Sequence, residues 1–321
     1  MKKILLFLFS ALFLVPSFAL ERQIGDYNFK LTASGSAGMI DNNNFNYYLL
    51  RGEINRDNFG AVYSYDSLAN LRKQFAKDAF VYMGHDFGRI EVGWTESVAA
   101  KLALTLPDVG GTRLNNQAFF YDDFVGITNP VIYGTEYAWR VNMIVVPSNE
   151  VQAGFARTVG NPAGFNSATD FGFRYKNPNG NIKTSFSFGF SYIDNLKNFI
   201  SDEYLPPTYA DSRYVATTGF NMQSGSLLWA ITGKKIIDYK AVGIKTDGWQ
   251  AGTGFSYEFL SWATSVNYIF SDSADFLAHT IIGSLRYKIT RNFNVWGSAG
   301  VVYLENFDDN RFVSFGLGVV F

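Results

Sequence analysis

The sequence predicts an all-β fold, a transmembrane antiparallel β-barrel. Three observations support this: an apolar leader at the N-terminus, a period-two alternation of apolar with polar residues through the rest of the chain, and a last segment that ends in an aromatic residue. In that segment Phe315, Leu317, Val319 and Phe321 alternate with serine and glycine. One apolar face opposite one small or polar face is typical of a strand between lipid and a lumen.

The first nineteen residues have the pattern of a secretory signal peptide. Lys2 and Lys3 precede the apolar run 4–15, and Pro16-Ser17-Phe18-Ala19 supplies small residues for cleavage after Ala19. No later apolar run reaches about 18 residues, so no membrane-spanning helix is predicted. We therefore expect residues 1–19 to be removed and residues 20–321 to form one β-barrel domain.

Composition narrows the classes further. The leader holds two lysines and no acid, so the mature part carries 25 basic and 28 acidic residues, a formal charge of −3 without a basic field for nucleic acid. The absence of cysteine in an exported chain excludes a disulfide framework. A closed barrel pairs all its strand edges, so its fold needs no disulfide framework. A secreted β-sandwich or solenoid is the alternative, and its strands would be shorter.

Sixteen alternating segments account for most of the mature chain. We expect strands at 24–37, 45–56, 58–68, 77–86, 87–95, 133–146, 150–158, 167–177, 181–194, 211–222, 225–236, 247–258, 261–270, 276–290, 292–304 and 310–321. Connections after even-numbered segments are short and turn-like, whereas most of the others are longer and polar. Tight turns at one rim and long loops at the other are the pattern of outer-membrane barrels.

Alternation also assigns the two faces of each segment. In 87–95, Ile90, Val92 and Trp94 share the face expected to meet lipid. The charged residues expected to face the lumen include Arg51, Glu53, Arg89, Glu91 and Arg140. A charge on the lipid face would cost about 2–4 kcal/mol at mid-membrane, which favours this assignment.

One connection is far longer than the others, about 37 residues from Glu96 to Ile132. It begins with an apolar, partly helical stretch, 98–104, and later contains an acidic aromatic stretch, 119–124. Long loops in compact folds tend to be functional. Because this one is apolar, we expect it to fold inward.

The leader, the sixteen segments, the terminal Phe321 and the long loop after the fifth segment together resemble the trimeric Gram-negative general porins. The run 84–111, GHDFGRIEVGWTESVAAKLALTLPDVGG, is most similar to the alphaproteobacterial branch of that family. The Pro-Glu-Phe-Gly type motif of enterobacterial porins is absent. The resemblance implies that loop 96–132 narrows the lumen, with acidic loop residues facing basic wall residues. By position these pore-constriction residues would be Asp108, Asp122, Asp123, Lys30, Arg51, Arg89 and Arg140.

The function implied by this resemblance is passive diffusion of ions and small hydrophilic solutes through the outer membrane of a Gram-negative bacterium. A homotrimer in contact with outer-membrane lipid and lipopolysaccharide is expected, with assembly by the barrel assembly machinery through Phe321. The near balance of charges predicts a weak cation preference, and no enzyme activity, nucleic-acid partner or cofactor is expected.

Other functions remain open at this stage. A substrate-specific channel would line its lumen with aromatics or with one sign of charge, and Trp296 is expected to point inward. An outer-membrane hydrolase would need His85 or His279, and a surface adhesin would use the loops. Calcium has two candidate sites, which are Glu305 with Asp308 and Asp309, and Asp41 with Asn42 to Asn44.

Overall fold

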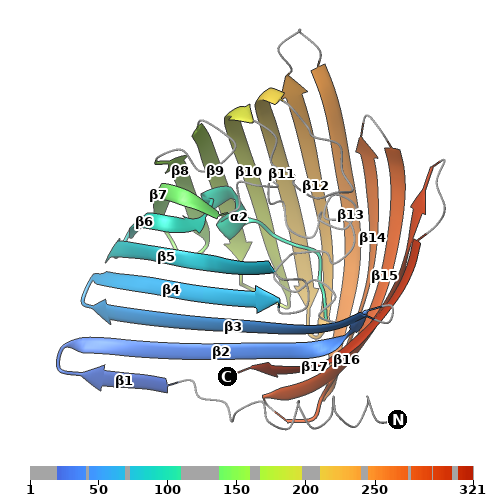
Figure 1. Ribbon diagram of the computed structural model, residues 1–321, viewed down its shortest axis with the longest axis horizontal. Helices are drawn as coiled ribbons and strands as arrows, with labels where there is room; N and C mark the ends of the chain where they lie inside the picture. The colour runs from blue at the N-terminus through green and yellow to red at the C-terminus, as the bar shows by residue number, and fades with distance from the viewer. Residues whose placement is uncertain are drawn as a thin grey trace.

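A computed structural model describes residues 20–40, 43–68, 73–109, 137–159, 167–196, 210–239, 245–273, 276–290, 292–305 and 310–320, which form one antiparallel sheet of seventeen strands and one short helix (Figure 1). The elements are β1 (Leu20–Ile24), β2 (Tyr27–Ile40), β3 (Asn43–Arg56), β4 (Phe59–Leu68), β5 (Lys73–His85), β6 (Gly88–Glu96), α2 (Val98–Leu102), β7 (Tyr137–Val145), β8 (Val151–Thr158), β9 (Ser167–Asn177), β10 (Ile182–Leu196), β11 (Ala210–Ser224), β12 (Leu227–Tyr239), β13 (Lys245–Phe259), β14 (Trp262–Ser273), β15 (Phe276–Lys288), β16 (Phe293–Leu304) and β17 (Asn310–Val320).

From β2 onward each strand pairs with the next one in the chain, and the last pairs with β2. The β17–β2 register runs from Ser314↔Ile40 to Val320↔Ser34. Strand β1 pairs with residues 27–31 of β2, so β1 and β17 occupy successive stretches of β2. Strand β2 thus pairs with three strands, β1, β3 and β17.

The sixteen predicted segments correspond to β2–β17, with ends that differ by four residues or fewer. The predicted count of sixteen is one short, because β1 is an additional strand. At five residues, β1 is too short to show an alternation of its own. A turn at Gly25, whose φ is +59°, separates it from β2.

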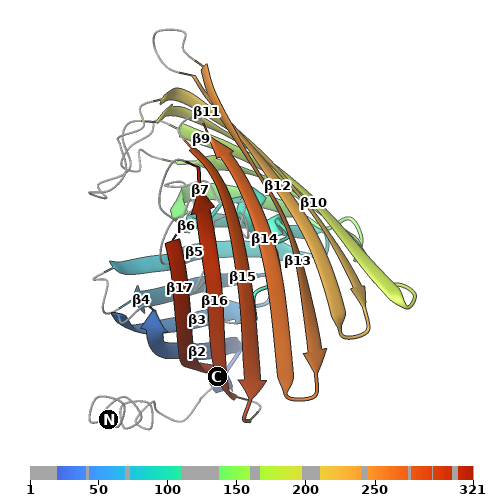
Figure 2. The same cartoon turned by 90° about the vertical axis from the view of Figure 1, so that its right-hand side faces the viewer.

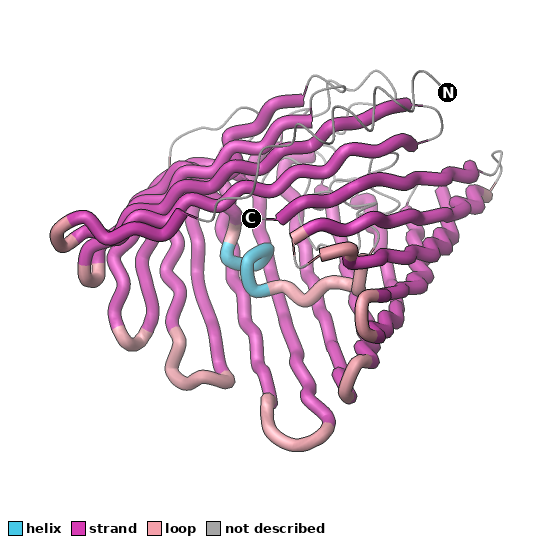
Figure 3. Tube along the Cα trace, turned by 90° about the horizontal axis from the view of Figure 1, so that it is seen from below, coloured by secondary structure: helices cyan, strands magenta, loops and turns pink. Residues whose placement is uncertain are grey.

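The sheet is curved (Figure 2), and α2 lies on its concave side (Figure 3). The predicted faces of the strands are confirmed where side chains are described. On β6, Ile90 and Val92 are 38% and 46% exposed on the convex face, whereas Glu91 between them is 0% exposed. Trp296 is buried on the concave face, also as predicted. The convex face is therefore apolar at these positions, whereas the concave face carries charged and polar side chains together with apolar ones.

Tight turns join the strands at one rim, as expected. β13 ends at Phe259 and β14 begins at Trp262, and Leu260 between them has a φ of +52°. The turn after β3 likewise has a φ of +51° at Asp57. Positive φ values are typical of two-residue hairpin turns, whose twist matches that of the strands.

Of the long loop predicted at 96–132, the structure describes the beginning, including α2 and residues 103–109. Residues 110–136 and the leader, 1–19, lie outside the described residues. Within the part of the chain that is described, no helix is both long and apolar enough to span a membrane.

Candidate functional site

A cavity of about 620 Å³ lies on the concave side of the sheet, where α2 faces β3, β5 and β6. Its charged lining residues are Arg51, Asp78, Arg89, Glu96 and Lys101. The apolar part of its lining includes Phe80, Leu102, Ile144 and Val146. Charged groups of both signs therefore share one cavity with an apolar surface.

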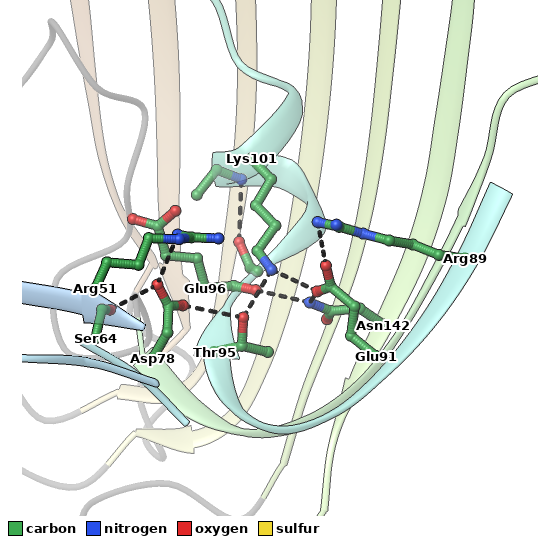
Figure 4. A network of polar contacts seen from close by, with 11 residues as sticks. Arg51, Ser64, Asp78, Arg89, Glu91, Thr95, Glu96, Lys101 and Asn142 are labelled. Atoms are coloured by element: carbon green, nitrogen blue, oxygen red, sulfur yellow. Dashed lines mark hydrogen bonds and ion pairs between the residues drawn. The ribbon is translucent and has the colours of Figure 1, made fainter. Parts of the chain in front are cut away.

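Helix α2 brings Lys101 to this cavity. The Ser97 hydroxyl caps the helix, because its Oγ accepts a hydrogen bond from the backbone N–H of Ala100 at 3.1 Å. Val98 and Leu102 pack in a buried apolar cluster with Ile144 of β7 and Ala156 of β8. Because Val98 and Leu102 pack against these strands, the side chain of Lys101 points toward β6 and reaches Glu91 (Figure 4).

Glu91 is the centre of one half of the polar network in Figure 4. Its Oε2 accepts hydrogen bonds from Lys101 Nζ and, at 2.9 Å, from Asn142 Nδ2. Its Oε1 lies 2.5 Å from a guanidinium nitrogen of Arg89. Burying an ionised carboxylate is costly unless it is paired and hydrogen-bonded. Two hydrogen bonds, from Lys101 and Asn142, and the ion pair with Arg89 meet that requirement here.

Asp78 of β5 is the centre of the other half. It accepts hydrogen bonds from Ser64 Oγ at 3.0 Å and from Thr95 Oγ1 at 3.3 Å, and Arg51 lies 3.7 Å away. The Thr95 hydroxyl in turn accepts a hydrogen bond from Lys101 Nζ at 2.7 Å. Charges of alternating sign thus follow one another along the network, in the order Arg51, Asp78, Lys101, Glu91 and Arg89.

Aromatic rings complete the surroundings of the two cations nearest Glu91. The Lys101 ammonium lies 4.7 Å from the centroid of the Phe80 ring, and the Arg89 guanidinium lies 5.7 Å from that of Tyr82. Both distances permit cation–π attraction. Burial lowers the pKa of Lys101, and its attraction to Glu91 opposes that change.

The structure brings together two of the seven residues predicted to constrict a pore. Arg51 and Arg89 both line the cavity, with side chains 42% and 41% exposed. Lys30 is exposed on β2, opposite Glu53 in the β2–β3 register, and does not line this cavity.

The other predicted residues lie elsewhere. Arg140 is fully buried on β7, with its Nε 3.9 Å from Asp170. Asp108 is partly buried, away from this cavity, in the segment that contacts β14. Asp122 and Asp123 fall outside the described residues. The part that these residues play in a constriction stays a prediction.

Three charged side chains of the network were not among the predicted site residues: Asp78, Glu91 and Lys101. Signals for each exist in the sequence. The alternation that turns Arg89 inward does the same for Glu91, and Asp78 shares its face with Phe80 and Tyr82. Lys101 is the one charged residue in the apolar stretch 98–104.

Neither a known family model nor a curated protein matches the sequence. Solved structures match over nearly the whole chain. An anion-selective porin from Comamonas acidovorans aligns with a TM-score of 0.65 and 12% identity, over 92% of this chain and 100% of the other. The OmpF complex with daunomycin from Salmonella typhi aligns with a TM-score of 0.66 and 12% identity, over 94% and 100%. The trimer form of OmpT, an outer membrane protein of Vibrio cholerae, aligns with a TM-score of 0.61 and 8% identity, over 92% and 99%. The chain therefore has the fold of porin and other outer-membrane protein structures.

Proposed function

We propose that this protein is a general diffusion porin, a water-filled channel through which ions and small hydrophilic solutes cross an outer membrane passively. The observation that carries the proposal is the distribution of side chains, with apolar ones on the outer face of the sheet and charged ones on the inner face. An apolar exterior surrounds a charged cavity, beside a segment that lies inside the curved sheet. A strand barrel with an apolar outer face and a polar lumen is the arrangement of a membrane pore.

In this proposal β2–β17 form a closed sixteen-stranded transmembrane barrel, and β1 is an accessory strand on β2. The pairing of β17 with β2 and of β9 with β10 supports closure. Loop 96–132 is the constriction loop, residues 1–19 are the cleaved leader, and residues 20–321 are the mature domain. A homotrimer in the outer membrane of a Gram-negative bacterium follows by analogy with the neighbour solved in a trimer form. Contacts with lipopolysaccharide and assembly through Phe321 belong to the same proposal.

Transport requires no catalysis and no cofactor in this mechanism. Opposed charges on the two sides of a narrow lumen create a transverse field that orients dipolar solutes, and the gap sets the size limit. Three basic and two acidic residues line the described cavity, and the buried Glu91 lies behind them, paired with Arg89. We propose that Asp122 and Asp123, together with the mature charge of −3, give a weak preference for cations.

A substrate-specific channel is the second candidate. Arg51 and Arg89 are both half-exposed on a cavity that also has an apolar surface at Leu102 and Ile144. Such a cavity would favour small carboxylates with an apolar part. Saturable block of the ionic current by such a carboxylate supports this candidate, whereas a current proportional to concentration supports general diffusion.

The test of the proposed function is reconstitution of the refolded mature protein into a planar lipid bilayer. The expected result is stable single-channel steps, in groups of three for a trimer, with a reversal potential in a salt gradient that has the sign of weak cation preference. A folded protein that inserts but gives no conductance would contradict a diffusion channel and favour a plugged, enzymatic or adhesive barrel.

A further inference from the structure

Three basic side chains lie together on the inner face of the β9–β10 hairpin, close to its turn. They are Arg174 and Lys176 of β9 and Lys183 of β10. The inner face of these strands is identified by Gly172 of β9 and Ser187 of β10, which both lie against the long loop. Side chains alternate in direction along a strand, so residues an even number of positions away share that face. The three cations therefore point inward.

The three cations are neighbours in the sheet. Arg174 and Lys176 are two residues apart on one strand, which places them about 7 Å apart. Lys176 is directly opposite Ser185 in the β9–β10 register, so Lys183 is its diagonal neighbour, at about 7–8 Å. One anion that lies among these side chains can therefore contact more than one of them.

The wall supplies no carboxylate to this group. Among the residues that the structure describes, none pairs with or accepts a hydrogen bond from the three side chains. The charge of Arg174 instead repels that of Lys176. The acid next to them in the sheet is Glu150, whose carbonyl oxygen accepts a hydrogen bond from the Lys176 N–H at 2.7 Å, but its carboxylate forms no ion pair there. With Glu150 counted, three positive charges and one negative charge leave a net charge of +2.

A second pair of inward cations shows the partner that is missing at β9 and β10. Arg286 and Lys288 of β15 are also two residues apart on a strand that ends at a tight turn. Their nitrogens lie 3.0 and 3.8 Å from the carboxylate oxygens of Glu258. Like charges that are held together are unfavourable unless an opposite charge lies near them. At β15 the wall supplies that charge, whereas at β9 and β10 it is left to a bound anion.

The chemistry of the group fits phosphate. A guanidinium matches two phosphate oxygens at once, and a lysine ammonium binds phosphate as a point charge. A net charge of +2 attracts a dianion more strongly than a monoanion such as acetate. Neutral polar groups stand beside the cations, namely Ser185, opposite Lys176, and Gln152, opposite Arg174. Because Gln152 also lines the charged cavity, the group adjoins that cavity.

We propose that Arg174, Lys176 and Lys183 form a binding site for phosphate, either inorganic phosphate or the phosphate group of a small solute. The site lies on the inner wall, between the charged cavity and the turn of the β9–β10 hairpin. In the proposed channel the tight turns face the periplasm, so the site holds phosphate at the periplasmic end of the passage. This role in transport rests on the proposed function, whereas binding itself does not require conduction.

The test is calorimetric titration of the refolded protein in detergent with inorganic phosphate, and in parallel with glycerol phosphate and acetate. The test variant is Arg174→Gln with Lys176→Gln. The matched control is Arg286→Gln with Lys288→Gln, which removes the same two kinds of charge from the same face of the sheet but from residues that have a carboxylate partner. Lys183→Gln is a third variant, and because Lys183 is exposed, its replacement does not disturb packing.

The expected result is saturable phosphate binding by the parent protein and by the control, with equal affinity. Loss of hydrogen bonds from charged donors should weaken binding by the test variant at least about tenfold. Lys183→Gln should weaken it by a smaller factor. Tighter binding of glycerol phosphate than of inorganic phosphate would assign the site to phosphorylated solutes, and the reverse order would assign it to the free ion.

Three results would overturn the proposal: no phosphate binding by the parent protein, equal losses in the test and control variants, or acetate binding as tight as that of phosphate. Unchanged binding by Lys183→Gln would overturn the site of three residues. In a planar bilayer, phosphate should reduce the chloride current saturably in the parent protein and not in the test variant. If the parent protein shows no conductance, the channel function fails, while calorimetry still decides whether the phosphate site exists.

Discussion

Two stretches of the inner wall differ sharply although their outer faces are alike. From β8 to β14 the inward residues beneath the loop are small, such as Gly172, Ser187 and Ser265. From β3 to β6 they include the long charged side chains of Arg51 and Arg89, which face the cavity. At these positions, residues 98–109 contact small wall residues, whereas charged wall residues line the cavity among the residues that the structure describes.

The outer faces show no such difference. Val92 on β6 and Val266 on β14 stand on the two stretches, and they are 46% and 54% exposed. Both are apolar, as the proposed contact of this face with lipid would require. The two stretches therefore differ on their inner faces: one contacts residues 98–109, and the other lines the charged cavity.

The largest expected effect comes from breaking the network on the open side. Glu91→Gln leaves Lys101 and Arg89 facing each other without the carboxylate that both bind. Removing one partner of a buried ion pair costs about 3–5 kcal/mol, and we expect a loss in this range in the free energy of unfolding. Denaturant unfolding in detergent or liposomes measures it.

Glu258→Gln is the matched control for that variant. Glu258 pairs with Arg286 at 3.0 Å, but its side chain is 53% exposed. An exposed pair contributes at most about 1 kcal/mol. Equal losses for Glu91→Gln and Glu258→Gln would contradict a buried anchoring role for Glu91.

The second effect tests whether the outer faces are equivalent. Val92→Arg and Val266→Arg each place a charge on the face assigned to lipid, at a cost of about 2–4 kcal/mol near mid-membrane. Gln152→Arg, at the cavity, should cost close to nothing. Folding free energies in liposomes provide the measurement. If Val92→Arg or Val266→Arg leaves the folding free energy unchanged, the outer face at that position is covered by something other than lipid.

The smallest effect concerns pH. Because burial lowers the pKa of Lys101, its ammonium should lose its proton below the usual value of about 10.4. The folded protein then binds fewer protons than the unfolded chain between the two pKa values, so stability rises with pH across that window. The lumen also loses a positive charge there, and cation preference should increase. Reversal potentials between pH 7 and 10 measure this change, and Lys101→Met should remove it. An unchanged pH dependence in Lys101→Met would exclude Lys101 as the group responsible.

Sequence patterns predicted the strands and their faces well, because a period of two residues is a local property. The predicted span 167–177 agrees with β9 at both ends. The alternation around Arg89 correctly placed Glu91 inside. These assignments need no knowledge of which strands are neighbours.

The arrangement of the site could not be predicted in the same way, since it depends on the register between distant segments. Val109 bonds to Ser265, 156 residues away. Gly154, Gly172 and Gly189 fall opposite one another on three strands, where Val98 and Ala99 of the loop approach them. Alternation indicates that Arg51 and Arg140 both face inward, but it does not indicate which of the two side chains is buried by other residues. The structure leaves Arg51 at the cavity and buries Arg140 beside Asp170.

The central claim of the proposed function, that solutes pass along the wall that carries Arg51 and not along the wall beneath residues 98–109, is tested most directly by thiol modification during current recording. Arg51→Cys places a single thiol on the open wall, and Thr217→Cys places one on the covered wall, where Thr217 is 6% exposed. We predict that a charged methanethiosulfonate reagent reduces the current through Arg51→Cys and leaves Thr217→Cys unchanged. Equal block of both variants, or block of Thr217→Cys alone, would contradict the account.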